Sequence, residues 1–350
     1  MVNITFKSWQ QTARFLNPLK GGSLDAQQIE VRLDPLTDHQ SIFNPALEGK
    51  ASTVLPDTDK AYLRERGEAS KATCFLCDGK WKKFSPSYSD DVIPGGRLVK
   101  GQAVIFPNLF PVAAYHALVM VGEQHFRTLD DFPPELLFDA FSASLDFIRM
   151  CYEADPQAIY FTINANFLFP AGASVVHPHL QILGSPFAGT HHRALLDASH
   201  TFFHEKQSCY WTELVDAEKH SGVRWIGDVG TSRWFTAYSP MGANEIDAVW
   251  PGKRHFLEWG DEDAWSLAEG LSRALRVYHS LKLSTFNLSC YGAALGHETP
   301  EFRCLLRLVN RQNVTPHYRT DDYYLQKLLG SEIIIHRPEQ LAELARKMFE

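Results

Sequence analysis

A five-residue motif, His177-Pro178-His179-Leu180-Gln181, constrains this chain more than any other stretch of its sequence. Every second side chain of an extended strand points to the same face, so His177, His179 and Gln181 are expected to share one space. Pro178 has no N–H group, which places the segment at a sheet edge or at the start of its strand. The motif therefore indicates a functional site rather than the alternative, a pair of histidines with a structural role.

The side chains of this motif favour group transfer between phosphates. A neutral imidazole is a competent nucleophile once a hydrogen bond to one ring nitrogen leaves the other free, and His179 is the central candidate. A sugar phosphate leaves without a strong general acid, because its second pKa is about 6. Gln181 can donate hydrogen bonds to phosphoryl oxygens but cannot carry a proton. A transferase or a phosphorylase is therefore expected, and a hydrolase is not.

Composition excludes several other classes of protein. With a net charge of −7 and a pI near 6.1, the chain is not expected to bind nucleic acid or an anionic membrane. The first residues lack a basic segment followed by an apolar core, and no apolar run reaches about 18 residues, so neither a signal peptide nor a membrane span is expected. The six cysteines indicate thiols or metal ligands. We expect a cytoplasmic protein.

A second pair of reactive side chains lies in the segment Cys74-Phe75-Leu76-Cys77-Asp78-Gly79. A Cys-x-x-Cys pair followed by glycine forms a knuckle that offers two thiolates to one metal ion. A redox pair and two unrelated thiols are the alternatives, and the lack of a surrounding βαβ pattern disfavours redox chemistry. The spacing thus indicates a metal site whose remaining ligands lie elsewhere in the chain.

The motif from His177 to Gln181 resembles the active site of the galactose-1-phosphate uridylyltransferase family, a branch of the histidine-triad superfamily. Relatives in this family include ADP-glucose phosphorylase and the diadenosine tetraphosphate phosphorylases. A second similarity is the segment Arg32-Leu33-Asp34-Pro35-Leu36-Thr37, which matches a hairpin near the start of the uridylyltransferases. The resemblance implies that His179 attacks the α-phosphorus of a nucleotide sugar and forms a covalent nucleotidyl-histidine.

The resemblance also implies a structural zinc site that joins distant parts of the chain. Its ligands are expected to be Cys74, Cys77, His125 and His177. Two sulfur and two nitrogen ligands in a tetrahedron suit zinc, and a site closed by four protein ligands is structural. The zinc is expected to hold the segment that carries His179 in place. A surface histidine before a helix is the alternative role of His125.

Family positions further imply contacts with the nucleotide and its phosphates. The substrate-binding candidates are Asn108, Asn166, Gly172, Ser174, Arg303 and Arg307. The alternatives are a turn asparagine, loop residues without a role, and ordinary surface arginines. The second, iron site of some uridylyltransferases is not expected, because the strand at 302–310 contains no histidine. The family's basic stretch is also missing from 44–50, where only Lys50 is basic.

Apolar periodicity predicts the order of helices and strands. Helices are expected at Phe6 to Phe15, 127–154, 262–281 and 339–350. Strands are expected on both sides of a turn within 31–43, and at 103–111, 116–125, 158–164, 225–228, 234–240, 246–253, 284–291 and 302–310. The pattern of strand, strand, helix and strand occurs twice, so we expect an α+β fold of two tandem histidine-triad-like halves, each a mainly antiparallel sheet with helices on one face. The half at 1–190 would hold both sites, and the half at 191–350 lacks catalytic histidines.

Together these features predict a nucleotidyltransferase that moves a nucleoside monophosphate between a nucleotide sugar and a sugar 1-phosphate. The first alternative is a phosphorylase that uses inorganic phosphate to cleave ADP-glucose or a dinucleoside polyphosphate. The second is a nucleotide-binding protein without turnover, against which the intact His179 and Gln181 argue. A homodimer is expected only by analogy with the family.

Overall fold

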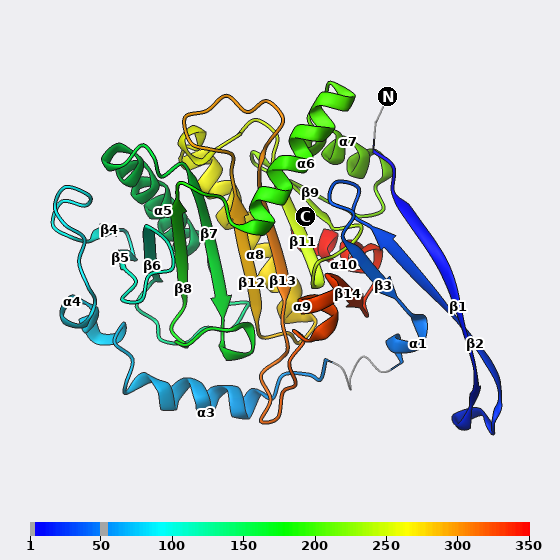
Figure 1. Cartoon of the computed structure of the whole chain (residues 1–350). Helices are drawn as coiled ribbons and strands as arrows, with labels where there is room; N and C mark the ends of the chain where they lie inside the picture. Colours follow the sequence, from blue (N-terminus) through cyan, green and yellow to red (C-terminus); the bar gives the residue numbers. More distant parts are fainter. Residues whose placement is uncertain (1–3, 50–54) are drawn as a thin grey trace.

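The structure, a computed structural model, describes residues 4–49 and 55–350 (Figure 1). Its strands are β1 (Lys7–Asn17), β2 (Ser23–Leu33), β3 (Gln40–Phe43), β4 (Leu98–Lys100), β5 (Ala103–Pro107), β6 (Tyr115–Val121), β7 (Tyr160–Phe167), β8 (His179–Ser185), β9 (Trp225–Val229), β10 (Ser232–Thr236), β11 (Ala243–Trp250), β12 (Phe286–Tyr291), β13 (Cys304–Asn310) and β14 (Ser331–Ile334). Its α-helices are α1 (Pro45–Glu48), α3 (Lys60–Lys71), α4 (Trp81–Phe84), α5 (Pro134–Ala154), α6 (Thr190–Lys206), α7 (Tyr210–Ser221), α8 (Asp261–Ser280), α9 (Tyr324–Leu329) and α10 (Pro338–Phe349).

A ten-stranded sheet forms the body of the molecule, and every pairing within it is antiparallel. Its strand order is β4-β5-β6-β8-β7-β12-β13-β11-β10-β9. Strands β4 to β8 and strands β9 to β13 thus follow the same internal order, and the pair β7 and β12 joins them. The predicted α+β class with mainly antiparallel sheets is confirmed.

Helices α5 and α8 cover one face of this sheet and bury its main core. Both helices show the spacing of three and four apolar residues that the sequence analysis used, and both predictions are confirmed. The prediction of helices on one face alone is wrong for the second group of strands. There α6 and α7 cover the opposite face, where Leu195 and Trp211 pack with Phe235. Helix α6 buries few apolar residues, so periodicity did not reveal it.

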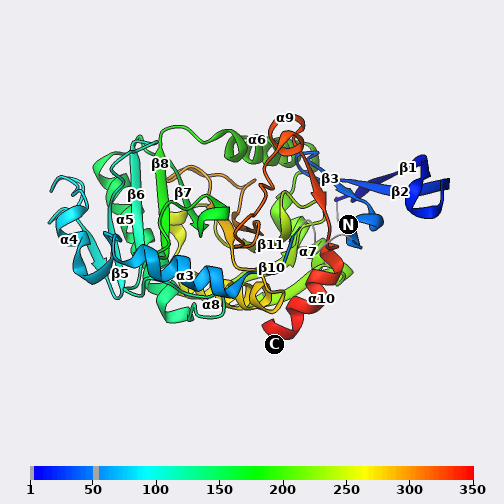
Figure 2. The same cartoon turned by 90° about the horizontal axis from the view of Figure 1, so that it is seen from below.

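A smaller sheet has the order β1-β2-β3-β14, and its hairpin of β1 and β2 projects from the body (Figure 2). The helix predicted from Phe6 to Phe15 is wrong, because these residues belong mainly to the exposed strand β1. Strand β1 pairs with β2 along its whole length, and Gly21 and Gly22 close the turn at positive φ angles of 65° and 79°. Pairing with the next segment of the chain in a hairpin therefore overrides the local helical pattern.

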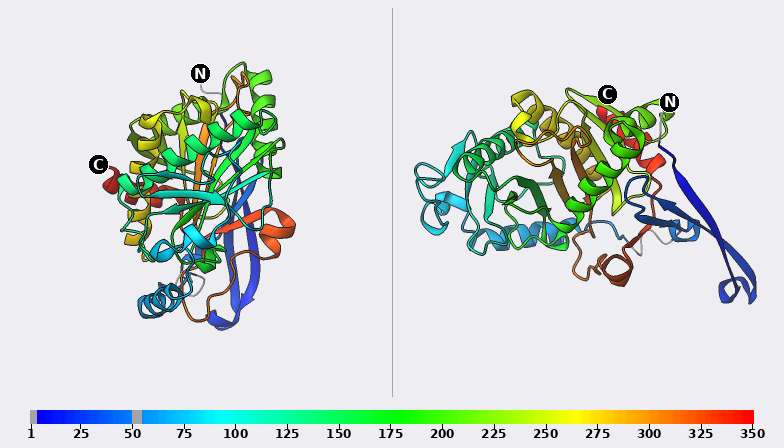
Figure 3. Two further views of the ribbon diagram at one scale, coloured as in Figure 1. Left: turned by 90° about the vertical axis from the view of Figure 1, so that its left-hand side faces the viewer. Right: turned by 45° about the horizontal axis from the view of Figure 1, so that its top comes forward.

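The smaller sheet ties the two ends of the described chain together (Figure 3). Strand β14 pairs with β3 in parallel, and Arg32 of β2 contacts Glu339 of α10 at 2.7 Å. The guanidinium of Arg32 also lies over the rings of Phe43 and Tyr238. The predicted strand, turn and returning strand within 31–43 are confirmed. Within residues 4–49 and 55–350, no helix combines the length and apolar character needed to cross a membrane.

Candidate active site and metal centre

The loop between β7 and β8 carries the motif onto the face of the sheet opposite α5. It contains Leu168 at the positive φ of 67° and Gly172 at 90°, so the backbone turns sharply before the motif. Strand β8 begins at His179, directly after Pro178, as the sequence analysis allowed. It lies between β6 and β7 in the middle of the sheet rather than at an edge. His177 therefore precedes the strand, and only His179 and Gln181 of the three polar side chains belong to it.

His179 is buried, and one of its ring nitrogens has a defined partner. Its Nδ1 lies 2.8 Å from the carbonyl oxygen of His177, so Nδ1 carries the proton and donates it. The lone pair of the neutral imidazole is therefore on Nε2. Burial lowers the pKa of His179, which keeps the ring neutral at pH 7. This is the state that a nucleophilic histidine requires.

Gln181 is oriented by His116, a residue that the sequence analysis did not select. The backbone N–H of Val112 donates to His116 Nδ1 at 3.2 Å, so His116 Nε2 carries the proton. This Nε2 lies 2.8 Å from Gln181 Oε1, which accepts the hydrogen bond. The Nε2 amino group of Gln181 is then directed away from His116 and can donate to an anion. His116 lies diagonally across from Gln181 on the paired strands β6 and β8. This pairing is seen only in the structure, so no pattern in the sequence points to His116.

A row of amides continues the site across the sheet. Asn164 pairs with Gln181 in register, so Asn166 shares its face and lies beside His179. On the next strand Asn287, also missed from sequence, donates to Asn166 Oδ1 at 2.6 Å. The predicted Asn166 therefore belongs to the same face of the sheet as His179.

The other candidates for phosphate binding lie in the loop before the motif. Gly172 is exposed, and a Cβ atom at this position would lie 3.7 Å from Asn166 Nδ2. Ser174 is exposed further along the same loop. The loop residues and Asn166 thus form one rim of the site, with their polar groups open to solvent.

The structure does not bring every predicted residue to His179. Arg303 donates to the carbonyl of Pro251 at 2.7 Å. It stands just before β13 and four residues before Arg307, so it lies about 13 Å further than Arg307 from the row of the sheet that contains His179. Arg307 pairs with Ser289 of β12, two strands from Asn164, in the same row of the sheet.

Asn108 combines a turn with a contact near the site. Its Oδ1 accepts the N–H of Phe110 at 2.9 Å, which is the turn role given above as the alternative. Its Nδ2 lies 3.3 Å from His116 Nε2, so Asn108 also borders the side chain that orients Gln181.

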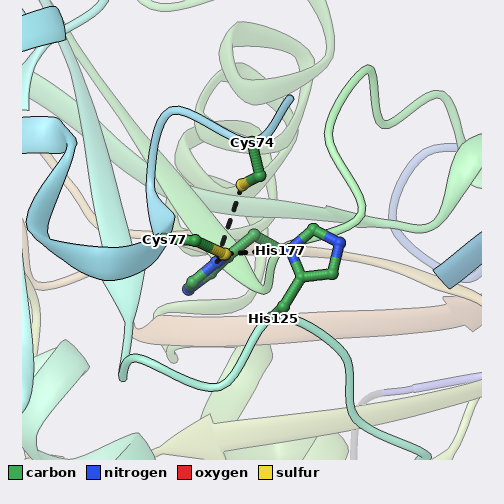
Figure 4. Close-up of side chains that lie close together, drawn as sticks. All are labelled: Cys74, Cys77, His125 and His177. Atoms are coloured by element: carbon green, nitrogen blue, oxygen red, sulfur yellow. Dashed lines mark hydrogen bonds between the residues drawn. The ribbon is translucent and has the colours of Figure 1, made fainter. Parts of the chain in front are cut away.

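The four predicted metal ligands meet in one buried cluster (Figure 4). Cys77 Sγ lies 3.2 Å from His125 Nδ1 and 3.4 Å from His177 Nδ1, and Cys74 Sγ lies 3.8 Å from His177 Nδ1. A tetrahedral zinc ion, with Zn–S of about 2.3 Å and Zn–N of about 2.0 Å, separates sulfur and nitrogen ligands by about 3.5 Å. The donor set and its spacing therefore fit zinc. Strand β6 ends at Val121, so His125 lies in the following loop and not at the end of a strand as predicted.

Hydrogen bonds on the far side of each imidazole aim its Nδ1 at the cluster. His177 Nε2 donates to the carbonyl of Gly122 at 2.9 Å, and His125 Nε2 lies 2.9 Å from Ser70 Oγ. Burial lowers the pKa of His177 to about 4, so this ring is a neutral donor. Burial, with Cys74 adding to it, raises the pKa of the Cys77 thiol to about 12. A bound cation would reverse that effect and hold the thiolate.

No protein-family model matches the chain. In sequence it is similar to an uncharacterised protein of Archaeoglobus fulgidus, with 28% identity over 336 residues that cover 95% of this chain and 96% of the other. It is also similar to ADP-glucose phosphorylase of Arabidopsis thaliana, with 22% identity over 254 residues, 66% of this chain and 67% of that enzyme.

Solved structures share the fold over most of the chain. The crystal structure of an ADP-glucose phosphorylase from Arabidopsis thaliana with bound ADP-glucose superposes with a TM-score of 0.69 at 20% identity, covering 91% of this chain and 99% of that one. A uridylyltransferase structure gives a TM-score of 0.63 at 20% identity over 71% of this chain and 85% of its own. The resemblance that the motif predicted is thus confirmed for the fold.

Proposed function

We propose that this chain is a nucleotidyltransferase that works by double displacement through a covalent nucleotidyl-histidine at His179. The observation that carries the proposal is the hydrogen bond of 2.8 Å from His179 Nδ1 to the carbonyl of His177. Because Nδ1 is occupied as a donor, Nε2 holds the lone pair that attacks phosphorus. Burial keeps this ring neutral, so no separate base is needed.

Two half-reactions use this nitrogen in turn. In the first, a bond forms between His179 Nε2 and the α-phosphorus of a nucleotide sugar, and the bond from that phosphorus to its bridging oxygen breaks. The electron pair leaves with the sugar 1-phosphate. In the second, a phosphate oxygen of the acceptor attacks the same phosphorus, and Nε2 recovers its lone pair.

The surrounding amides hold the phosphoryl oxygens as charge develops on them. The amino group of Gln181, directed by His116, is the donor closest in sequence to the nucleophile, and Asn166, Gly172 and Ser174 supply the loop side of the site. One preorganised donor of this kind contributes roughly 10²–10³ in rate. Gln181 has no proton to pass to water, so the intermediate persists until a phosphate acceptor arrives.

The acceptor in this proposal is a sugar 1-phosphate, and a phosphorylase that uses inorganic phosphate is the second candidate. Two observations favour the second candidate. Helix α1 and its cap, from Asn44 to Gly49, carry no lysine or arginine, while Lys50 lies outside the described residues. The chain is also similar to ADP-glucose phosphorylase over a larger share of its length than to the uridylyltransferase structure.

The proposal includes a structural zinc ion on Cys74, Cys77, His125 and His177. Zinc would crosslink the loop before β8 to two other segments, and His179 itself takes no part in holding it. The proposal also includes two histidine-triad-like halves at 1–190 and 191–350, which the equal strand orders support. It further includes a homodimer. The six free, buried cysteines support a reducing cytoplasm as the compartment.

Intact-mass measurement of the protein mixed with nucleotide sugars tests the proposal. With donor and no acceptor, we expect a gain of one nucleoside monophosphate, which disappears when the acceptor is added. Sugar 1-phosphate and inorganic phosphate, added separately, identify the acceptor by the product formed. Nucleotide binding without any adduct or product would instead support the binding protein without turnover.

A further inference from the structure

A cavity of about 300 Å³ lies away from the His179 site, between the start of α3, the segment 126–129 before α5, and the turn from α8 to β12. It shares no lining residue with the active site or the metal cluster. Its volume is at the lower end of the range for small-ligand sites, which begins at about 300 Å³.

The lining of this cavity is cationic in a chain that is acidic as a whole. Its basic side chains are Lys60, Arg64, Arg127, His279 and Lys282, and none of the described residues that line it is an aspartate or glutamate. The net charge of the chain is −7, so such a local excess does not follow from composition. The cavity is therefore selective for an anion.

Three of these basic side chains are held in place by acids that stand outside the lining. Lys282 pairs with Asp57 at 2.7 Å, while His279 and Arg127 contact acids of the segment 130–131 at 3.5 and 3.2 Å. Lys60 and Arg64 form no ion pair within the described part of the chain, and they stand one helical turn apart on α3. These two cations are therefore free to bind a ligand.

Arg127 supplies a buried donor that lacks an acceptor. Its side chain is 10% exposed, and its Nη1 donates to the carbonyl of Asp131 at 3.0 Å. Its Nε has no hydrogen-bond partner among the described residues. Arg127 therefore adds buried positive charge beside the cavity.

The wall of the cavity is preformed. Thr58 Oγ1 donates to the carbonyl of Lys282 at 2.9 Å, and the N–H of Asp59 donates to the carbonyl of Val314 at 3.0 Å. These bonds fix the chain before α3 against the turn that follows α8. A ligand would therefore bind with little ordering of the protein.

The floor of the cavity is apolar. Leu63, Leu129 and Leu283 are buried there, and the ring of Phe126 is partly buried beside them. An inorganic anion would leave this surface in contact with water, whereas an anion with an aromatic body would cover it. We propose that this cavity is a second ligand site, separate from the active site, that binds a nucleoside monophosphate with its base on the apolar floor and its phosphate between Lys60 and Arg64.

Helix α3 connects the cavity to the metal cluster. Its first residues line the cavity, and Ser70 near its end contacts His125 Nε2 at 2.9 Å. Between them, Gly67 packs so closely on the ring of Phe126 that a Cβ would lie 3.2 Å from it. A ligand in the cavity would hold α3 in position against the metal ligand, so occupancy should slow hydrogen exchange across α3.

Equilibrium dialysis of the whole protein with AMP tests this site. We expect two AMP molecules per wild-type chain, one of them at the active site. The double variant Lys60→Glu/Arg64→Glu should bind its second AMP at least tenfold more weakly and retain the first. The control Arg66→Glu reverses one charge on α3 away from the cavity and should leave both sites intact. Adenosine and inorganic phosphate should each bind this site at least tenfold more weakly than AMP.

Hydrogen exchange and the variants separate this inference from the proposed function. Saturating AMP should slow hydrogen exchange at 60–71 in the wild type. The variant Arg64→Gln removes only one charge, so its second AMP should bind less than tenfold more weakly. Binding of one AMP that the double variant abolishes would support this site and contradict nucleotide binding at His179. Equal AMP binding by the wild type and the double variant, or no protection of α3, would overturn the inference.

Discussion

The two groups of strands in the large sheet share one strand order but differ in the side chains at matched positions. In β8, His179 and Gln181 pair with residues of β6; in β13, Leu305 and Arg307 pair with the matching residues of β11. A leucine thus stands where the first group has the proposed nucleophile. The strand order repeats, but the proposed catalytic side chains do not.

The faces around these positions also differ in their cover. The side of β8 that carries His179 is partly open, whereas α6 and α7 cover the corresponding side of β13. Leu305 is 1% exposed and packs in one cluster with Trp211 and Phe235. Exchanging an imidazole for leucine and adding two helices converts a site into a core.

A charged interior replaces the amide row in the second group. Arg307 lies 3.6 Å from Glu245, and burial, with Glu245 adding to it, raises the pKa of Asp247 well above its ordinary value. Within the described residues, Arg307 Nε and Asp247 Oδ1 have no hydrogen-bond partner. Arg307 stays a proposed contact for substrate phosphate at the far end of the row.

The segments just before β8 and β13 also differ in what their side chains bind. His177, two residues before His179, joins the metal cluster, while Arg303, two residues before Leu305, donates to backbone carbonyls at 2.6 to 2.8 Å. Backbone hydrogen bonds in the second group therefore stand where the first group has a proposed metal ligand.

The largest expected effect is on the nucleophile. His179→Ala should abolish the nucleotidyl adduct in intact-mass measurements, because no other imidazole stands in its place. The matched variant Leu305→Ala should keep the adduct and lower the free energy of unfolding by about 2–5 kcal/mol, since it leaves a cavity in a buried cluster. Transfer at the wild-type rate by His179→Ala, or kinetics that require both substrates bound together, would contradict the covalent mechanism.

The next largest effect concerns Gln181, whose amide is proposed to bind the phosphoryl oxygens. Gln181→Ala should lower the transfer rate by roughly 10²–10³ and still form the adduct, because it removes one donor to the phosphoryl oxygens. Single-turnover kinetics measure this step. His116→Ala should reproduce part of the loss by releasing the amide of Gln181, and a normal rate in both variants would exclude the orienting role.

Zinc content should distinguish His177 from its neighbour His179 and from Arg303, the residue at the matching position before β13. His177→Ala should lose zinc in elemental analysis and lower the free energy of unfolding by about 3 kcal/mol, because the metal crosslinks segments far apart in sequence. Arg303→Ala should retain zinc and cost about 1 kcal/mol from lost hydrogen bonds. His179→Ala should also retain zinc, and wild-type protein without zinc or iron would contradict the site.

The smallest effect is an acid sensitivity of the second group. Burial lowers the pKa of His192, in the first turn of α6, to about 4. The unfolded chain, with a histidine pKa of about 6.5, therefore binds the proton more readily than the folded chain. The free energy of unfolding should fall by about 2–3 kcal/mol as the pH falls from above 6.5 towards 4. Unfolding curves from pH 7 to 4 measure this slope. His192→Gln should flatten it, and an unchanged slope would exclude His192 as its source.

Local sequence was enough for the long helices and for the site at 177–181. Helices α5 and α8 repeat apolar residues at a spacing that only one buried helical face explains, and Pro178 marks the start of β8. The hairpin of β1 and β2 and the helix α6 were not predictable in this way, because β1 is largely exposed and α6 is only weakly periodic. Helix α7 does bury apolar residues at helical spacing, a signal that was missed.

The sequence by itself determined which chemical groups are available to this protein: a histidine proposed as the nucleophile, an amide that cannot carry a proton, and two thiols spaced for a metal. Only the tertiary structure decided how they act. The hydrogen bond to His177 selects the reactive nitrogen of His179, and His116, on the neighbouring strand, turns the amide of Gln181. The register between paired strands and the burial of each group set these contacts, because tautomer, orientation and pKa depend on neighbours that are distant along the chain.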